Sequence, residues 1–120
     1  MNWIWPNFSV GEFDSPDMIG SGYNMDSDFM DKLQKARKIA KIPFKISSGY
    51  RSEAHNKAVG GVENSSHLKG LAADIVVNNG HERLFIVLAL LEAGFRRIGV
   101  AKTFIHVDSD SDKPNSMWTY

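Results

Sequence analysis

The chain contains no cysteine, so disulfide bonds and thiolate metal sites are excluded. Any metal ion must therefore be bound by nitrogen and oxygen atoms. Long apolar runs are also lacking, because the longest, residues 84–91, is far too short to span a bilayer. Neither sign of charge dominates: 14 Lys and Arg balance 14 Asp and Glu. No overall field favours nucleic acid or an anionic membrane, and we expect neither a nucleic-acid partner nor membrane insertion.

The opening residues, MNWIWPNFSVGEFDSPD, lack both a basic segment and a long apolar segment. They do not form a conventional signal peptide. We therefore expect synthesis in the cytoplasm without a signal peptide. If the protein acts outside the membrane, another factor must release it.

Length and composition indicate one globular domain. The chain has 120 residues, of which 42% are hydrophobic and 23% charged, and it shows no internal repeat. We expect a single domain over residues 1–120. Residues 1–23 form an aromatic-rich N-terminal arm that lies over this domain. The arm is expected to be anchored by burial of Trp3, Trp5, Phe8 and Phe13.

The remaining pattern alternates short strands with helices. Helices are predicted from an N-cap among residues 26–28 to Ala40, from Ser52 to Val59, and from Glu82 to Ala93. In the last helix, Leu84, Phe85, Leu88 and Leu91 share one apolar face. Strands are predicted at residues 44–47, 71–77, 97–101 and 104–108. The tail from Ser109 is predicted to be a loop, with Trp118 and Tyr120 docking back. This order indicates an α+β fold with helices packed on a small, largely antiparallel sheet.

Two histidines and one aspartate have the arrangement of a catalytic zinc site. Asp74 lies in the strand LAADIVV and His106 in the strand FIHVD. Because side chains alternate along strands, pairing of the two strands with these faces aligned brings Asp74 and His106 together. His67 precedes Asp74 on an incoming loop, and Gly70 allows a tight backbone between them. Three protein ligands leave a fourth position of the metal open for water.

A plainer interpretation of these residues stays open. Asp74 can be a buried carboxylate satisfied by backbone donors, although a carboxylate in an apolar strand favours a cation or several donors. His55 and His81 fit no ligand geometry as well. We expect His55 to be a structural or supporting residue on its short helix, and His81 to lie on the surface where a helix begins.

The segment SGYRSEAHNKAVGGVENSSHLKGLAADI, together with FIHVD, resembles the M15 family of zinc peptidases. The similarity is to the short subgroup related to D-Ala-D-Ala carboxypeptidases, and FSVGEFDSPD resembles the start of that subgroup. The resemblance implies the compact α+β fold shared with the hedgehog signalling domain. It also implies that Zn²⁺ is bound by His67, Asp74 and His106.

The resemblance further implies hydrolysis of peptide bonds in peptidoglycan, either removal of a terminal D-alanine or cleavage within the stem or crosslink. The small size resembles lytic enzymes encoded by bacteriophages or prophages. We therefore expect action on the bacterial cell wall after release, or as a virion-associated protein. The expected partner is a peptidoglycan peptide, and the expected oligomeric state is a monomer.

Two further residues match functional positions of the family. Arg51, in the Ser-Gly-Tyr-Arg turn, matches an arginine that holds substrate or stabilises the oxyanion. A guanidinium suits either role, and pairing with a local acid is the structural alternative. Ser65 matches the motif serine, which either binds the substrate backbone or caps the loop.

The general base is the position at which this sequence departs from the family. Several branches carry an acid three residues before the last histidine ligand, and here that residue is Thr103. Asp108 is the best substitute by strand geometry, but an alternative role is to orient a histidine ligand. Asp110 and Glu63 are more distant candidates. The loss of the acid leaves a second function open: a catalytically inactive, metal-binding domain for wall binding or for virion structure.

Overall fold

A five-stranded sheet with strand order β1-β2-β4-β3-β5 forms the centre of the fold. The computed structural model describes residues 2–120; residue 1, the first of the predicted arm, lies outside them. The strands are β1 (Ile46–Ser48), β2 (Ala72–Val76), β3 (Arg97–Val100), β4 (Phe104–Asp108) and β5 (Ser116–Thr119). Pairing is antiparallel except between β3 and β5, which run parallel. The predicted α+β class with a mostly antiparallel sheet is confirmed.

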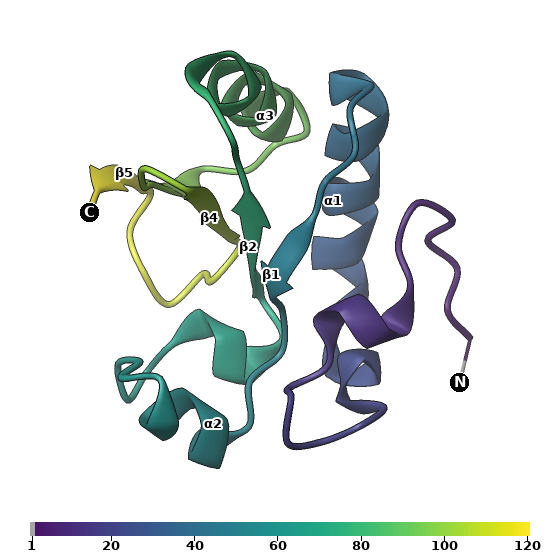
Figure 1. Cartoon of the computed structure of the whole chain (residues 1–120), viewed down its shortest axis with the longest axis vertical. Helices are drawn as coiled ribbons and strands as arrows, with labels where there is room; N and C mark the ends of the chain where they lie inside the picture. Colours follow the sequence, from purple (N-terminus) through teal and green to yellow (C-terminus); the bar gives the residue numbers. More distant parts are fainter. Residues whose placement is uncertain (1) are drawn as a thin grey trace.

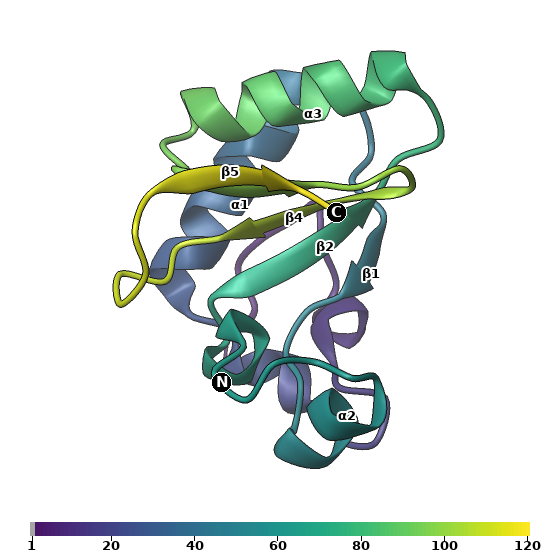
Figure 2. The same cartoon turned by 90° about the vertical axis from the view of Figure 1, so that its left-hand side faces the viewer.

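Helices lie on both sides of this sheet (Figures 1 and 2). The helices are α1 (Ser27–Ala40), α2 (Glu53–Ala58) and α3 (Gly80–Glu92), and the 3-10 turns are η1 (Val10–Phe13), η2 (Ser21–Asn24) and η3 (Ser66–Lys69). The α1 and α3 helices pack against each other over one face, whereas α2 and η3 lie beyond the other. Side chains of Asp26, Ser52 and Asn79 cap the three α-helices at their N-termini. Within residues 2–120, no helix is long and apolar enough to cross a membrane.

Strand alternation separates the core from the functional face. Ala73 and Ile75 of β2, like Ile105 and Val107 of β4, are fully buried in the core under the helices. The residues between them point to the opposite face. That face carries Asp74 and His106, as the sequence pattern predicts.

The N-terminal arm is anchored as expected. Phe13 is fully buried, Trp5 and Phe8 are buried, and Trp3 packs against this cluster. The Trp5 indole also donates a hydrogen bond to Asp31 of α1, with 2.9 Å between the indole nitrogen and Asp31 Oδ1. Apolar burial, this hydrogen bond and two more between Asn7 and Gln34 of α1 thus hold the arm against α1.

The buried face of α3 differs from the one identified in the sequence. Leu84, Phe85 and Leu88 are 55%, 43% and 46% exposed. The side chains that enter the core are Ile86, Ala89 and Leu90. Because α3 is apolar around most of its circumference, its periodicity does not define one face, and packing against α1 decides the orientation.

The tail also differs from its prediction as a loop, because it ends in β5. This strand pairs in parallel with β3, so that Gly99 lies opposite Trp118. A four-residue edge strand carries too little alternation to be recognised from sequence. The expected docking of Trp118 is confirmed: its ring packs 5.5 Å from that of His106.

Candidate metal centre

One row of residues across the sheet defines the functional face. Asp74 is the direct cross-strand partner of His106, and His106 is the partner of Gly99. The row continues to Ser48 on one edge strand and Trp118 on the other. Because paired residues point to the same face, the five strands place these side chains side by side.

His67 reaches the same face from η3, the turn that precedes β2. The hydroxyl of Ser65 accepts a hydrogen bond from the His67 backbone nitrogen and so caps this turn. Gly70 ends it with a φ of 70°, and a Cβ there would lie 2.2 Å from the carbonyl oxygen of Asn24. Only glycine fits this tight return of the chain into β2.

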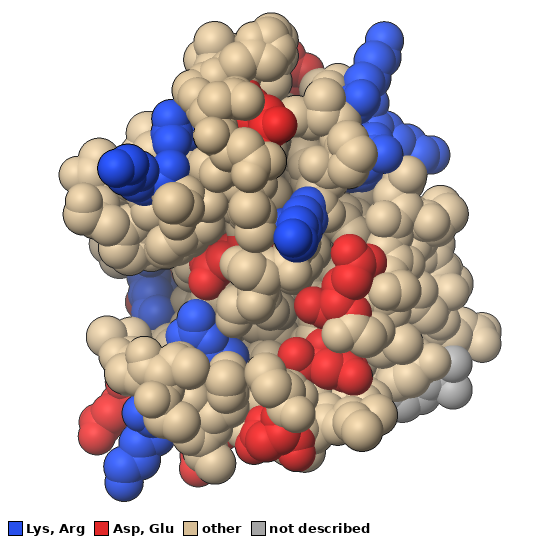
Figure 3. All heavy atoms as spheres, viewed as in Figure 1, with Lys and Arg blue, Asp and Glu red and all other residues tan. Residues whose placement is uncertain are grey.

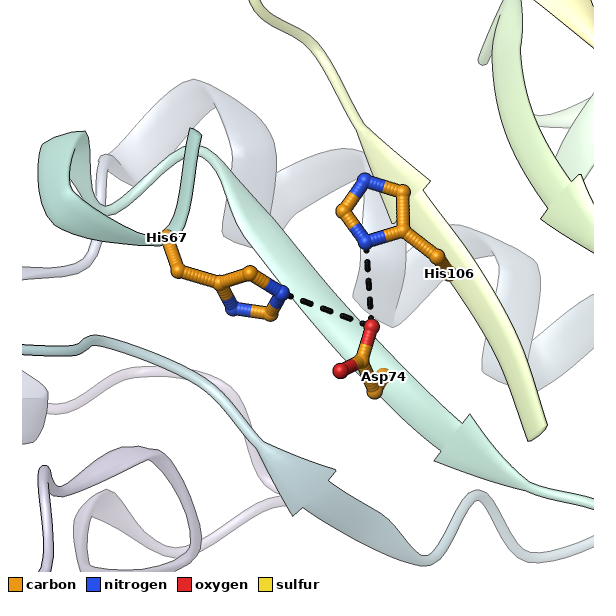
Figure 4. Close-up of side chains that lie close together, drawn as sticks. All are labelled: His67, Asp74 and His106. Carbon is orange, nitrogen blue, oxygen red and sulfur yellow. Dashed lines mark hydrogen bonds and ion pairs between the residues drawn. The ribbon is translucent and has the colours of Figure 1, made fainter. Parts of the chain in front are cut away.

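The three predicted ligands meet at one point (Figure 4). Asp74 Oδ1 lies 3.0 Å from His106 Nδ1 and 3.4 Å from His67 Nε2. One ligand atom from each residue lies within 4.8 Å of the others. The structure thus brings together a loop imidazole, a strand carboxylate and a second strand imidazole.

The hydrogen bonds to the two rings fix which nitrogens face the centre. His67 Nδ1 lies 2.7 Å from the carbonyl oxygen of Gly49, which only accepts, so Nδ1 carries the hydrogen. His67 Nε2 faces Asp74 Oδ1, and in the neutral ring this nitrogen has a lone pair that can bind a metal ion. In His106, Nε2 lies 2.7 Å from Asp108 Oδ2 and Nδ1 faces Asp74.

Charge interactions within the cluster oppose the effect of burial. Burial alone raises the pKa of Asp74, but hydrogen bonds and charge interactions with His106 and His67 outweigh it and hold this pKa well below its usual range. Burial likewise opposes the charged form of His106, while Asp108 and Asp74 raise its pKa above the ordinary value. The cluster therefore keeps Asp74 ionised.

These donors fit a tetrahedral divalent metal ion such as zinc. Ligand atoms about 2.0–2.1 Å from a tetrahedral ion lie about 3.3 Å from one another. The observed separations from Asp74 Oδ1, 3.0 and 3.4 Å, bracket that value. Two neutral imidazoles and one carboxylate are ligands that zinc accepts, and they leave a coordination position open.

Asp108 lies behind His106. Its carboxylate is 1% exposed, and it accepts from Arg97 Nε at 2.7 Å and from the backbone nitrogen of Asp110 at 3.1 Å. Its second oxygen is the one that contacts His106 Nε2. Of the two roles that the sequence left open for Asp108, these contacts favour orienting the imidazole.

Arg51 lies beside the cluster. Its guanidinium is 3.5 Å from Asp74 Oδ2, and it also donates to Ser48 Oγ and to the Asn56 side chain. The acid with which Arg51 pairs is therefore the candidate metal ligand itself.

The other candidates from the sequence lie elsewhere. Thr103 is in the turn between β3 and β4, where its carbonyl accepts from Val77. Asp110 is buried against Ser66 and Lys69. Glu63 is exposed and does not line the cleft that opens onto the cluster. His55 and His81 do not join the metal cluster.

A cleft of about 400 Å³ opens onto the cluster. In the space-filling view, a notch between the region of β5 and the region of α2 contains both basic and acidic atoms (Figure 3). One wall carries Gly60, Gly61 and Val62, and the other carries Phe104, Trp118 and Tyr120. The cluster thus lies on the floor of an open cleft.

Sequence reasoning missed Arg97 as a residue of this site, and it predicted that Trp118 docks back without placing it in the cleft. The Arg97 guanidinium lies 4.9 Å from the centre of the Trp118 ring. Gly99 is the one feature of the sequence that indicates the position of Trp118, because a glycine inside a strand often marks the close approach of another group. A Cβ at Gly99 would lie 2.6 Å from Trp118 Nε1.

Comparisons with known proteins agree with this geometry. No curated protein sequence matches the chain. The solved L-Ala D-Glu endopeptidase ChiX of Serratia marcescens has a similar fold, with a TM-score of 0.51 and 24% identity over 59% of this chain. That match spans 62% of the Serratia chain. The family model described as Peptidase M15 matches residues 24–108, which include all three cluster residues. The chain belongs to the peptidase M15 family.

Proposed function

We propose that this protein is a zinc-dependent peptidase that hydrolyses peptide bonds in peptidoglycan stem peptides or crosslinks. The observation that carries the proposal is the His67–Asp74–His106 cluster on the floor of an open cleft. Membership of the peptidase M15 family supports the reaction class. The fold shared with an enzyme described as an L-Ala D-Glu endopeptidase supports the substrate class.

The roles follow from the contacts of each side chain. Zinc held by His67, Asp74 and His106 supplies Lewis acidity and a water of lowered pKa. Arg51 binds either a substrate carboxylate or the developing oxyanion, because its guanidinium lies at the edge of the cluster. Ser65 lines the cleft beside His67 and offers its oxygen to the substrate backbone while it caps η3.

Asp108 acts in this proposal as a positioning residue. It receives the Nε2 hydrogen of His106 and thereby leaves the Nδ1 lone pair for the metal. Arg97 neutralises the buried carboxylate from the other side. A carboxylate held on both sides and 1% exposed is poorly placed to take a proton from water in the cleft.

The competing function is a metal-binding domain without catalysis, used for wall binding or as a virion component. One observation favours it: the two carboxylates that line the cleft, Asp74 and Asp108, are both engaged. Thr103 does not replace them. Both functions are compatible with action at the cell wall after release or with a virion-associated protein.

One experiment separates these functions. Purified protein is incubated with peptidoglycan and with isolated muropeptides, with and without a chelator, and the products are identified by mass spectrometry. The proposal predicts chelator-sensitive cleavage of a stem or crosslink bond. Bound zinc at unit stoichiometry without any product over long incubation would establish the non-catalytic domain instead. The mass of the products also distinguishes a carboxypeptidase from an endopeptidase.

A further inference from the structure

The cleft has no carboxylate free to exchange a proton with a substrate among the residues that the structure describes. Asp74 contacts both imidazoles, and Asp108 is enclosed by His106, Arg97 and the backbone of Asp110. Peptide hydrolysis nevertheless needs a proton for the leaving amine. Another side chain in the cleft has to supply it if the proposed function holds.

Tyr120 is a cleft residue whose side chain can do so, whereas the Lys113 ammonium is held by Asn64 and Ser66. It follows β5 and lies outside residues 24–108, which match the family model. Its backbone nitrogen donates to the carbonyl of Val100, which continues the pairing of β5 with β3. Its ring packs 5.1 Å from that of Phe104. Because Tyr120 is 71% exposed, its hydroxyl is accessible to a bound peptide.

Gly99 explains how this ring comes to lie in the cleft that contains the metal centre. Gly99 is the cross-strand partner of His106, and a Cβ on it would lie 2.9 Å from Tyr120 Cε2. The tyrosine ring therefore occupies the space above Gly99, next to the metal ligand. A side chain at position 99 would exclude both Tyr120 and Trp118 from this place.

We propose that Tyr120 is a catalytic residue that donates its phenolic proton to the leaving amine. This inference rests on the proposed peptidase function. Water adds to the carbonyl carbon, and the carbon–nitrogen bond then breaks as nitrogen takes the phenolic proton. The new carboxyl group still carries the hydrogens of the attacking water and then returns one of them to the phenolate. Water is thus divided between the new carboxyl group and the new amine, and no other reactant is needed.

The electrostatic surroundings agree with this role. Partial burial raises the pKa of Tyr120 above its ordinary value of 10.0, and the negative charges of Asp74 and Asp108 raise it further. A hydrogen bond with Trp118 and the cation of Arg51 act in the opposite direction. The charged groups on the floor of the cleft therefore influence the pKa of the phenol, which remains protonated at neutral pH.

The decisive variant is Tyr120→Phe, which removes one oxygen and keeps the ring packed on Phe104. We expect kcat to fall about 100-fold, the lower bound of general acid catalysis, with KM nearly unchanged. Zinc content and melting temperature should equal those of the wild type. The wild-type kcat should decline at high pH with the pKa of the phenol, and the variant should lose this decline. Ultraviolet absorbance titration of the phenolate, compared between the two proteins, gives that pKa independently of activity.

Two further variants complete the test. Tyr23→Phe is the matched control, because Tyr23 lies on the N-terminal arm against Trp3 and does not line the cleft. It should leave kcat unchanged. Gly99→Ala should lower kcat because its methyl group displaces Tyr120 and Trp118 while every zinc ligand is retained.

The outcomes distinguish the two proposals. If the wild type cleaves peptidoglycan and Tyr120→Phe keeps kcat within about twofold, the inference is overturned and the proposed function stands. If the variant loses zinc or stability together with kcat, the residue is structural and the inference is also overturned. If the wild type itself cleaves nothing, both proposals fail.

Discussion

Asp108 approaches His106 from the side of the ring opposite to the metal centre: Asp108 Oδ2 lies 2.7 Å from His106 Nε2, while His106 Nδ1 faces Asp74. The two carboxylates thus hold one imidazole between them. Two neighbouring rows on the same face of the sheet account for this arrangement, because Asp74 pairs with His106 and Asp108 pairs with Ala72 and Arg97. One row carries the candidate metal ligands Asp74 and His106, and the next row carries the carboxylate that contacts His106.

Replacing Asp108 by Asn should therefore weaken metal binding more than it changes the chemistry. The amide no longer accepts the His106 hydrogen as a charged group, so we expect zinc affinity to fall about 10- to 100-fold. Competition with a chromophoric chelator measures this change. With saturating zinc, a substantial part of the activity should return.

Asp28→Asn is a suitable control for Asp108→Asn, since Asp28 is exposed on α1. Its zinc affinity should equal that of the wild type. Complete inactivity of the Asp108 variant with a full complement of zinc would show that Asp108 transfers a proton itself. The orienting role would then be rejected.

His67→Ala should abolish the response of the protein to chelator. Bound metal stabilises the native state by mass action, by about 2.7 kcal/mol when free zinc is one hundred times the dissociation constant. Chelator should therefore lower the melting temperature of the wild type and leave that of His67→Ala unchanged. Calorimetry in zinc and in chelator makes the comparison, with His81→Ala as the control histidine. An equal chelator response in both proteins would remove His67 from the ligand set.

The meeting of the three candidate ligands could be predicted because local patterns determine it. Alternation in two short strands places Asp74 and His106 on one face, and a glycine turn returns the chain from His67. The wall of the cleft could not be predicted in the same way. Trp118 reaches His106 only through the parallel pairing of β5 with β3, and no local pattern specifies a long-range contact of an edge strand.

The orientation of α3 also could not be predicted from a local sequence pattern. Apolar residues surround most of this helix, so sequence periodicity supports more than one buried face. The choice depends on α1, against which α3 packs in the folded protein. Tertiary packing, which is not visible in the helix sequence alone, buries Leu90 and leaves Leu88 exposed.

This orientation predicts opposite results for two leucines of α3. Leu90 is fully buried, so Leu90→Ala should cost about 2–5 kcal/mol of unfolding free energy. Leu88 is 46% exposed, and Leu88→Ala should change stability by no more than about 0.5 kcal/mol. Urea denaturation of both variants measures the difference. Equal destabilisation by the two substitutions would contradict the observed rotation of the helix.

Asp110 should make stability depend on pH in the acid range. Burial alone raises its pKa, but the Ser66 hydroxyl and the Lys69 ammonium outweigh this effect and lower the pKa from 3.8 to about 2. Since the folded pKa lies below the unfolded one, this stabilisation is fully present above the unfolded pKa. It is lost as the pH falls through the folded value.

We therefore expect Asp110→Asn to be less stable than the wild type at neutral pH, by about 1–3 kcal/mol for hydrogen bonds to a buried charge. The difference should shrink as the pH falls from about 4 to about 2, because the wild type then loses the same charge. Urea denaturation of both proteins in chelator, across this range, isolates the carboxylate from metal binding. Asp112→Asn is the control, since the Asp112 side chain is 82% exposed although it also contacts Lys69. A stability difference that stays constant down to about pH 2 would show that Asp110 contributes through its shape and not through its charge.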